Sequence, residues 1–471
     1  MSHKRFNILL LTCMLLAGSG CKKYLDVQPT GYYTEDQVFA NKAATQQALN
    51  GLYIDLANND LYGAALTQTY VELIAQRFRA FSDGVNYYEQ FQQNNYTAPQ
   101  VQLVFDGIWK AAYHTIMSAN LFLSKIDATV TTDVVSEAQG NLMKGEALAI
   151  RALLHFDMLR LFGPVHSLGA NNPSIPYYTL ANGKSEPIIT SAQVIEKILA
   201  DLTAAITLLA DDAISQIGVV PQNDPDFYTG RRNQRMNLFA VKALLARVYL
   251  WAGKNQEAHD QALEVITSAE QWFPWLPYTS IVNNPTPDRL FSTELLFAVY
   301  NRNIYKNYTS YYSPALTESR LLVPEIVNLK NVFENNENDW RYPTTWRQTN
   351  RAYRTFFKYE EISTNQSWGY LQPMIRKSEL YYILAETETD PSLARSYLNS
   401  VRNNRGLGNL ATIAFLPAEI TKEYQKEFYG EGQLFFYYKR INATSIPDAM
   451  NNLPRTPVYV VPLPLSETTP R

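Results

Sequence analysis

The chain of 471 residues contains few of the groups that most often carry catalysis. Its two cysteines, Cys13 and Cys21, are too few for a disulfide framework, and the histidines after residue 20 are scattered rather than spaced as metal ligands. A nucleophile elbow and a phosphate-binding loop are both missing from the sequence. A nucleotide-dependent enzyme is therefore not indicated, and we expect no cofactor, no metal ion and no catalytic residue.

Charge and long apolar runs are also scarce. Charged residues make up 18% of the chain, and 41 basic residues against 44 acidic ones give a formal net charge of −3. This slight acidic excess does not suit a phosphate backbone, so nucleic acid is not expected as a partner. After residue 20 no apolar run approaches the roughly 20 residues that a membrane-spanning helix requires. We therefore expect a soluble body.

Paired carboxylates are the one catalytic arrangement that is harder to exclude, because the two acids of a glycosidase can lie far apart in sequence. Glu386 and Asp390 lie close to a predicted helix end, where solvated or capping roles suit them. Glu423, Glu427 and Glu431 lie four residues apart and are predicted to share one acidic helix face. A role in packing or at the surface is favoured for this face over an active site.

The N-terminal segment is the most informative feature that is present. Lys4 and Arg5 precede an apolar run from Phe6 to Ala17, and Gly18-Ser19-Gly20-Cys21 follows. This order is typical of a secretory signal that ends in a lipobox, with a plain secretory signal as the alternative. Cys21 is therefore the expected lipid-attachment site, and acyl chains there would hold the protein on a membrane.

Hydrophobic spacing predicts a mainly α fold. Apolar residues from Leu238 to Ala252 share one helix face, Gly253 ends that helix, and a second helix begins near Gln256. This pair is similar to a tetratricopeptide unit, so we expect a scaffold of such hairpins. Further helices are predicted over 41–56, 107–126, 146–162, 192–209, 377–386 and 390–402, the last with Asp390 as its N-cap. The stretches 79–100, 211–235, 272–288 and 301–373 are predicted to be ordered loop excursions with little β structure.

Aromatic residues are abundant, with 32 Tyr, 21 Phe and 7 Trp. Tyrosine and tryptophan combine a flat apolar face with a polar tip, so they serve both packed cores and contact surfaces. We expect most of these rings to pack in a helical body and the remainder to line a binding surface.

The order of several short motifs resembles the SusD/RagB family of surface lipoproteins. The sequence after Cys21 is similar to the start of the mature family members, and Arg405-Gly406-Leu407 follows a helix as in the family. The other motifs that carry the resemblance are Gly145 to Gly163, Ala243 to Gly253, Arg376 to Arg402, Glu423 to Gly432, Lys439-Arg440 and Val461 to Pro464. Tyr424, Leu434 and Tyr437 depart from it, because the family has Arg, Arg and Asp there and so has ion-pair partners that this chain lacks.

The resemblance implies a binding protein rather than an enzyme. It would be lipid-anchored in the cell outer membrane, face outward, capture a polysaccharide and deliver it to a SusC-like TonB-dependent transporter for nutrient uptake. Because the family also includes members of oligopeptide importers, capture of peptides is the alternative, and a tethered glycosidase is a weaker third reading. The implied regions are a signal peptide (1–20), an N-terminal region (21–220), a central helical pair with the start of a ligand loop (221–320) and a C-terminal region (321–471).

The resemblance also implies where the ligand binds. Family members place ligand contacts in the loop after the first helices, here 82–99, and in the middle excursion, here about 272–368. Aromatic rings for stacking and amides for hydrogen bonding are the expected contacts. The candidates are Tyr87, Tyr88, Asn94, Asn95, Tyr96, Tyr311, Trp340, Trp346 and Trp368. For each of them, the alternative role is that of a packed loop anchor.

Overall fold

The computed structural model describes residues 35–79, 88–220, 226–362, 366–412, 415–449 and 456–468. The predicted signal segment, Cys21 and Tyr87 lie outside the described residues. Within the described ranges, no helix combines the length and the hydrophobicity that crossing a membrane requires.

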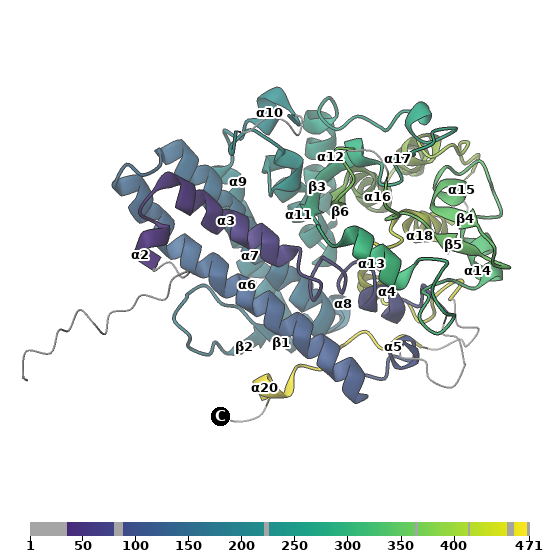
Figure 1. Ribbon diagram of the computed structural model, residues 1–471, viewed down its shortest axis with the longest axis horizontal. Coiled ribbons are helices and arrows are strands. Elements are labelled where there is room, and N and C mark those ends of the chain that lie inside the picture. The colour runs from purple at the N-terminus through teal and green to yellow at the C-terminus, as the bar shows by residue number, and fades with distance from the viewer. Residues whose placement is uncertain are drawn as a thin grey trace, which may run out of the picture.

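Three long helices run side by side through the N-terminal half (Figure 1). They are α3 (Lys42–Leu56), α6 (Pro99–Thr131) and α7 (Glu137–Phe162). Asn41 caps α3, as Ala44 N–H donates to its Oδ1 at 2.9 Å. Helix α7 begins earlier than predicted because Ser136 and Gln139 form a capping box before the periodic apolar pattern starts.

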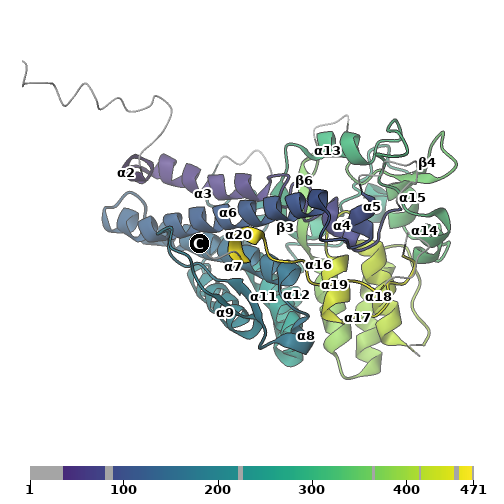
Figure 2. The same ribbon diagram turned by 90° about the horizontal axis from the view of Figure 1, so that it is seen from below.

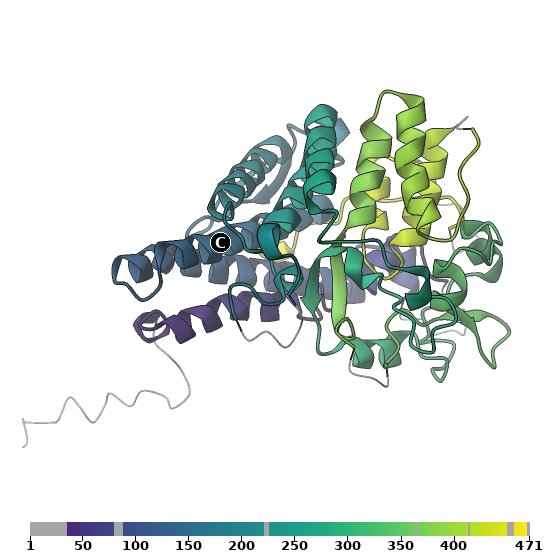
Figure 3. The same cartoon turned by 90° about the horizontal axis from the view of Figure 1, so that it is seen from above.

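A row of shorter helices stands across these long ones, as Figures 2 and 3 show. The row contains α9 (Ser191–Leu208), α11 (Leu238–Trp251), α12 (Asn255–Ala269), α16 (Lys377–Thr387), α17 (Pro391–Asn403) and α18 (Leu416–Glu427). From α9 to α17 each helix contacts the next, α18 contacts α16, and α9 contacts α7. Gly253, at φ +71°, turns the chain from α11 into α12, and Asp390 caps α17, so the helices predicted on either side of these two turns are confirmed. The tetratricopeptide likeness stays a prediction.

Within the described residues, strands are few and pair in three antiparallel ribbons. They are β1 (Pro173–Pro176) with β2 (Ile188–Thr190), β3 (Leu295–Tyr300) with β6 (Leu371–Arg376), and β4 (Trp346–Gln348) with β5 (Arg354–Phe356). Tyr300 pairs with Leu371, so the β3–β6 ribbon closes the base of the long excursion between them. That excursion is ordered where described and contains α13 (Ile304–Tyr311), α14 (Ile326–Val332) and α15 (Arg341–Thr345). The predicted mainly α fold with little β structure is confirmed.

Short elements complete the described chain. They are α2 (Glu35–Val38), α4 (Tyr70–Ile74), α5 (Glu89–Gln92), α8 (His166–Gly169), α10 (Ile214–Ile217), α19 (Leu434–Arg440), α20 (Leu465–Thr468), η2 (Arg232–Gln234), η3 (Tyr278–Ser280) and η4 (Ser292–Glu294). One continuous apolar core extends from Leu49 to Val461, and a small satellite cluster of Leu276, Ile281 and Phe291 lies beneath the loops. The row of helices and the loop excursions therefore pack on shared core residues.

The C-terminal helices pack through rings where the sequence departs from the resemblance. Tyr424 of α18 and Tyr437 of α19 stack with centroids 4.1 Å apart and planes at 19°. The Tyr437 hydroxyl lies 2.7 Å from the Thr421 hydroxyl, and Leu434 is buried. Aromatic stacking therefore packs these helices at the positions where the sequence departs from the charged residues of the resemblance.

A buried acid of α4, Glu72, provides a test of the packing between the two ends of the chain. Its Oε1 accepts a hydrogen bond from Gly432 N–H at 2.9 Å, and burial raises its pKa to about 7. The folded state therefore favours the protonated acid, and the stability it contributes is lost as pH rises from about 4.5 to about 7.

We expect Glu72→Gln to gain stability relative to the native chain over this pH range, by up to about 3 kcal/mol. Glutamine keeps an oxygen for Gly432 N–H and carries no charge at any pH. Urea unfolding at pH 5 and pH 8 measures the difference. A stability difference that does not change with pH would contradict this assignment.

Candidate functional site

A pocket of about 410 Å³ opens beside Trp340, where η3 and the segment before α15 meet. Its volume is within the range of small-molecule sites. The lining combines two aromatic rings with amide, hydroxyl and carboxylate groups. The residues that define this Trp340 pocket are Tyr278, Asn283, Glu337, Asn338, Trp340 and Thr344.

The two rings of the pocket form an edge-to-face pair. The centroids of Tyr278 and Trp340 lie 5.5 Å apart, and their planes make an angle of 63°. Tyr278 is 51% exposed, whereas Trp340 is partly buried and packs on the satellite cluster. The tryptophan is thus anchored by the core, and the tyrosine adds a solvent-exposed ring next to it.

The indole of Trp340 lies close to the backbone after α17. The backbone N–H of Trp340 donates to the carbonyl oxygen of Arg405 at 2.9 Å. Gly406 has φ +81°, and a Cβ atom there would lie 2.2 Å from Trp340 Nε1. Glycine is therefore required both by the left-handed backbone and by the close approach of the ring. The sequence indicated only that Gly406 ends a helix.

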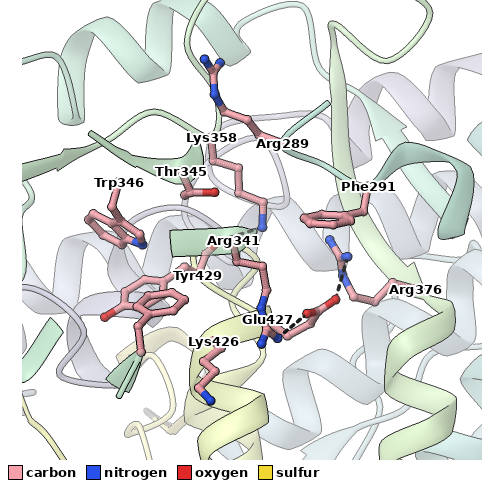
Figure 4. Close-up of a pocket in the computed structure, with 11 residues that line it drawn as sticks. Arg289, Phe291, Arg341, Thr345, Trp346, Lys358, Arg376, Lys426, Glu427 and Tyr429 are labelled. Carbon is pink, nitrogen blue, oxygen red and sulfur yellow. Dashed lines mark hydrogen bonds and ion pairs between the residues drawn. The ribbon is translucent and has the colours of Figure 1, made fainter. Parts of the chain in front are cut away.

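Buried ion pairs hold both neighbours of Trp340, and Figure 4 shows Arg341, one of these neighbours, with Glu427. Arg341 Nε donates to Asp339 Oδ1 at 2.8 Å, which clamps the backbone around the tryptophan. The other guanidinium nitrogens of Arg341 reach Glu427 Oε2 at 2.8 Å and Glu423 Oε2 at 3.0 Å, both on α18. A rigid support of this kind fixes the direction of the indole before any ligand arrives.

Glu427 is the centre of this charged network. Its carboxylate accepts hydrogen bonds from Arg341, from Arg376 at 3.2 Å and from Arg405 at 2.6 Å. Although burial alone would raise its pKa, the guanidinium groups of Arg405, Arg376 and Arg341 hold the pKa of Glu427 well below its ordinary value. Three cations surrounding one carboxylate leave it charged in the folded protein at neutral pH.

The predicted acidic helix face is therefore a buried one. Glu423 and Glu427 lie on α18, but Glu431 comes after the end of that helix, and its Oε2 accepts from Arg376 Nε at 2.8 Å. Burial would raise the pKa of Glu423, yet Lys426 and Arg341 lower it to about 2. All three acids pack the C-terminal helices against distant segments, as the favoured packing role predicted. The prediction that all three share one helix face is wrong, because Glu431 lies beyond the end of α18.

Three of the predicted ligand contacts are core residues in the structure. Trp346 is fully buried, with its ring 4.9 Å from Phe356. Tyr96 is 6% exposed and donates to the carbonyl oxygen of Val458 at 2.8 Å. Asn94 is also buried, and its Oδ1 accepts from Val458 N–H at 3.4 Å. These side chains are closed to a ligand because they tie the loop and the C-terminal segment to the core.

Trp346→Ala should lower the free energy of unfolding by about 3–5 kcal/mol, because a large buried ring leaves a cavity. Denaturant unfolding of the variant measures this loss. A stable Trp346→Ala protein with weakened ligand binding would instead place this ring at the binding surface.

The remaining candidates lie apart from the Trp340 pocket. Tyr88, Tyr311 and Trp368 are half-buried rings packed against the main core, and Asn95 Nδ2 donates to Gln90 Oε1 at 2.6 Å. Of the nine candidates, Trp340 is the one described residue that lines this pocket. Tyr278, its aromatic partner, was not singled out, although it lies within the predicted ligand excursion.

A second aromatic group near α13 was also not predicted. Tyr370 lies between Tyr300 and Tyr305, with centroids 5.4 Å and 4.8 Å away, and Tyr300 is 38% exposed. The closely spaced tyrosines of this loop-rich excursion are the sequence signal that could have predicted the group. This group offers exposed ring edges, but the pocket with amide and carboxylate lining is at Trp340.

Groups that could hold a metal ion do not gather in the described part of the chain. Among its described residues, no cluster of three or more His, Cys, Asp or Glu side chains is placed to hold a metal ion. His155 is packed in the core: its Nε2 accepts from Tyr178 N–H at 3.1 Å, and burial lowers its pKa to about 3. This histidine is therefore neutral and structural.

Two family models match the chain. One, described as starch-binding and associating with the outer membrane, matches residues 23–250. The other, described as the SusD family, matches residues 299–459.

Curated relatives match over part of their length. SusD-like protein P2 of Formosa agariphila is 27% identical over 268 residues, which cover 56% of this chain and 45% of that protein. A SusD-like protein of Bacteroides ovatus is 26% identical over 243 residues, which cover 52% of this chain and 38% of that protein. The chain thus spans about half the length of these relatives, or less.

Solved structures match over most of the chain. A SusD superfamily protein from Bacteroides thetaiotaomicron has a TM-score of 0.65 at 22% identity, covering 85% of this chain and 89% of that one. A laminarin-binding SusD-like protein has a TM-score of 0.64 at 19% identity, covering 91% and 97%. At this level of identity the likeness concerns the fold.

Proposed function

The chain belongs to the SusD/RagB family, and from this premise we propose that it captures a glycan outside the cell through the Trp340 pocket. Proteins of this family are binding proteins, and glycan binding is characteristic of them. Delivery of the glycan to a SusC-like TonB-dependent transporter is the second part of the proposal. Attachment to the outer membrane through lipid on Cys21 is the third part, supported by the sequence around that cysteine.

The observation that carries the proposal is the anchored indole of Trp340 next to the exposed ring of Tyr278. Sugar rings present flat apolar faces, which stack on aromatic rings, and hydroxyls, which pair with amide and carboxylate groups. Asn283 and Asn338 supply amides in the same pocket, and Glu337 supplies a carboxylate. If stacking on a sugar is comparable to aromatic pairing, each ring contributes about 0.5–1.5 kcal/mol beyond area burial.

Weak contacts of this kind suit a protein that must release its ligand to a partner. The pocket is already formed, so the affinity is not reduced by ordering of the tryptophan segment. Of the nine ligand-contact candidates predicted from the sequence, Trp340 lines this pocket. Tyr88, Tyr311, Asn95 and Trp368 remain candidates for contacts elsewhere on the surface.

The test is a binding screen of the protein with laminarin, starch, other polysaccharides and peptides, by affinity electrophoresis and calorimetry. Laminarin is included because one structural neighbour is described as binding it. Saturable binding of one polysaccharide class without release of product supports the proposal. Binding of peptides alone would replace glycan capture with peptide capture, and product release would indicate a glycosidase.

A further inference from the structure

A second pocket, of about 360 Å³, lies where α6, the connection between β1 and β2, and α20 come together. In Figure 1, β1, β2 and α20 lie at the bottom of the molecule, away from α15 at the right. We propose that this second pocket binds a sugar that carries a carboxylate, such as a hexuronic acid unit of an acidic polysaccharide. The choice of a sugar rests on the proposed function, whereas the choice of an acid rests on this pocket alone.

The wall of the second pocket consists of aromatic rings that are already held in place. Tyr113 lies between Trp109 and Tyr178, with centroid distances of 4.4 Å and 5.5 Å. Trp109 is 4% exposed and is fixed edge-on against Phe162 at 4.9 Å. The Tyr113 hydroxyl donates to the carbonyl oxygen of Pro176 at 3.1 Å, which links α6 to β1. The wall therefore offers flat apolar surface for a ring without rearrangement.

The charge at the pocket is positive, in contrast to the chain as a whole. Lys110 of α6 and Lys184 of the β1–β2 connection line it, and both side chains are exposed. Within the described residues, neither ammonium group forms a salt bridge. The acid of the lining is Glu467 of α20, which is half-buried, and His114 adds a further donor at the exposed face of α6.

Two lysines from separate elements meet at the aromatic wall of this pocket. Together they favour a ligand that has both a ring and a negative charge. An ammonium group is a flexible point charge that pairs with carboxylate, and a hydrogen bond between two charged groups is stronger than one between neutral groups. The volume is near the lower end of the range for small-molecule sites, which suits a single ring rather than a long chain. A neutral sugar would use the wall but leave both lysines unpaired.

The test is calorimetric titration with galacturonate and glucuronate, each compared with its neutral counterpart, galactose or glucose. We expect the acids to bind at least about tenfold more tightly than the neutral sugars, and the double variant Lys110→Gln/Lys184→Gln to lose that preference. Raising the salt concentration from about 50 mM to about 500 mM should weaken binding of the acidic sugars but not of the neutral ones, because screening acts on exposed charges. Tyr178→Ala should weaken binding of both kinds of sugar.

A matched control removes two exposed lysines elsewhere, in Lys254→Gln/Lys306→Gln, and should leave uronate binding unchanged. Thermal melts of both double variants establish that they are folded. Equal affinity for acidic and neutral sugars, an unchanged Lys110→Gln/Lys184→Gln variant, or no uronate binding would each overturn the inference. Trp340→Ala separates the two sites, since it should leave uronate binding intact even where polysaccharide capture at the Trp340 pocket fails.

Discussion

Trp340→Ala is expected to weaken capture of the bound polysaccharide by at least about tenfold, which corresponds to about 1.4 kcal/mol. The reason is that the variant removes the anchored ring of the Trp340 pocket and also the support of the Tyr278 edge. Because the indole is only partly buried, the free energy of unfolding should fall by less than in Trp346→Ala. Affinity electrophoresis and urea unfolding of the same preparation measure the two effects.

Two further variants sharpen this result. Trp340→Phe keeps a flat ring at the same place and should recover part of the lost affinity. Phe415→Ala removes a large ring that is 76% exposed at the start of α18, and it should bind as the native chain does. Native affinity in Trp340→Ala, or equal losses in Trp340→Ala and Phe415→Ala, would remove the Trp340 pocket from the proposed function.

Glu427→Gln should destabilise the fold by about 3–5 kcal/mol, because it leaves buried guanidinium groups without their shared counter-charge. Arg341, Arg376 and Arg405 all donate to this carboxylate, and all three are buried. The substitution preserves size and removes only charge, so cavity formation does not contribute. Urea unfolding at neutral pH measures the loss.

The pH dependence of the same variant is a second check. The pKa of Glu427 is depressed in the folded state, so its contribution to stability is present above about pH 4.5 and is lost as pH falls below it. The difference in the free energy of unfolding between the native chain and Glu427→Gln should therefore become smaller at acidic pH. Glu264→Gln, at an acid 51% exposed and paired with Lys242, should cost less than about 1 kcal/mol. A Glu427→Gln protein as stable as this control would contradict the assigned role of the network.

The charged network and the Trp340 pocket depend on each other through the chain. Asp339 and Arg341, on either side of Trp340, both belong to the network. Arg405 also belongs to it, and its carbonyl oxygen accepts from Trp340 N–H. Loss of Glu427 should thus loosen the tryptophan as well as the fold. Burying several charges is costly, and holding the aromatic ring in one direction is the functional gain that this arrangement offers.

Local signals in the sequence predicted the helices well. Asn41, Gly253 and Asp390 begin or end helices through contacts with their own neighbours, so a short window contains all the information needed. The start of α7 was placed too late, because its first turns are polar and only the capping box of Ser136 and Gln139 marks them. The motif order further indicated the family to which the chain belongs.

The choice among aromatic residues was decided by tertiary structure. Trp340 and Trp346 come from the same loop-rich stretch, yet the first lines a pocket and the second is fully buried. A stretch without helical or strand periodicity does not show which side chains face the core. The sequence therefore predicted both tryptophans as ligand contacts. Tyr278 acquired its role only because a distant turn packs beside Trp340.

By itself, the sequence determined the helical class, the main helix ends and the family, since these depend on local propensity and on motifs in order. Only the tertiary structure decided which rings meet, which acids are buried and where the pockets open. Glu427 illustrates the difference: four-residue spacing suggested an acidic helix face, whereas arginines from three distant segments made a buried network. The physical reason is that burial and charge compensation depend on residues far apart in the chain, which no local pattern records.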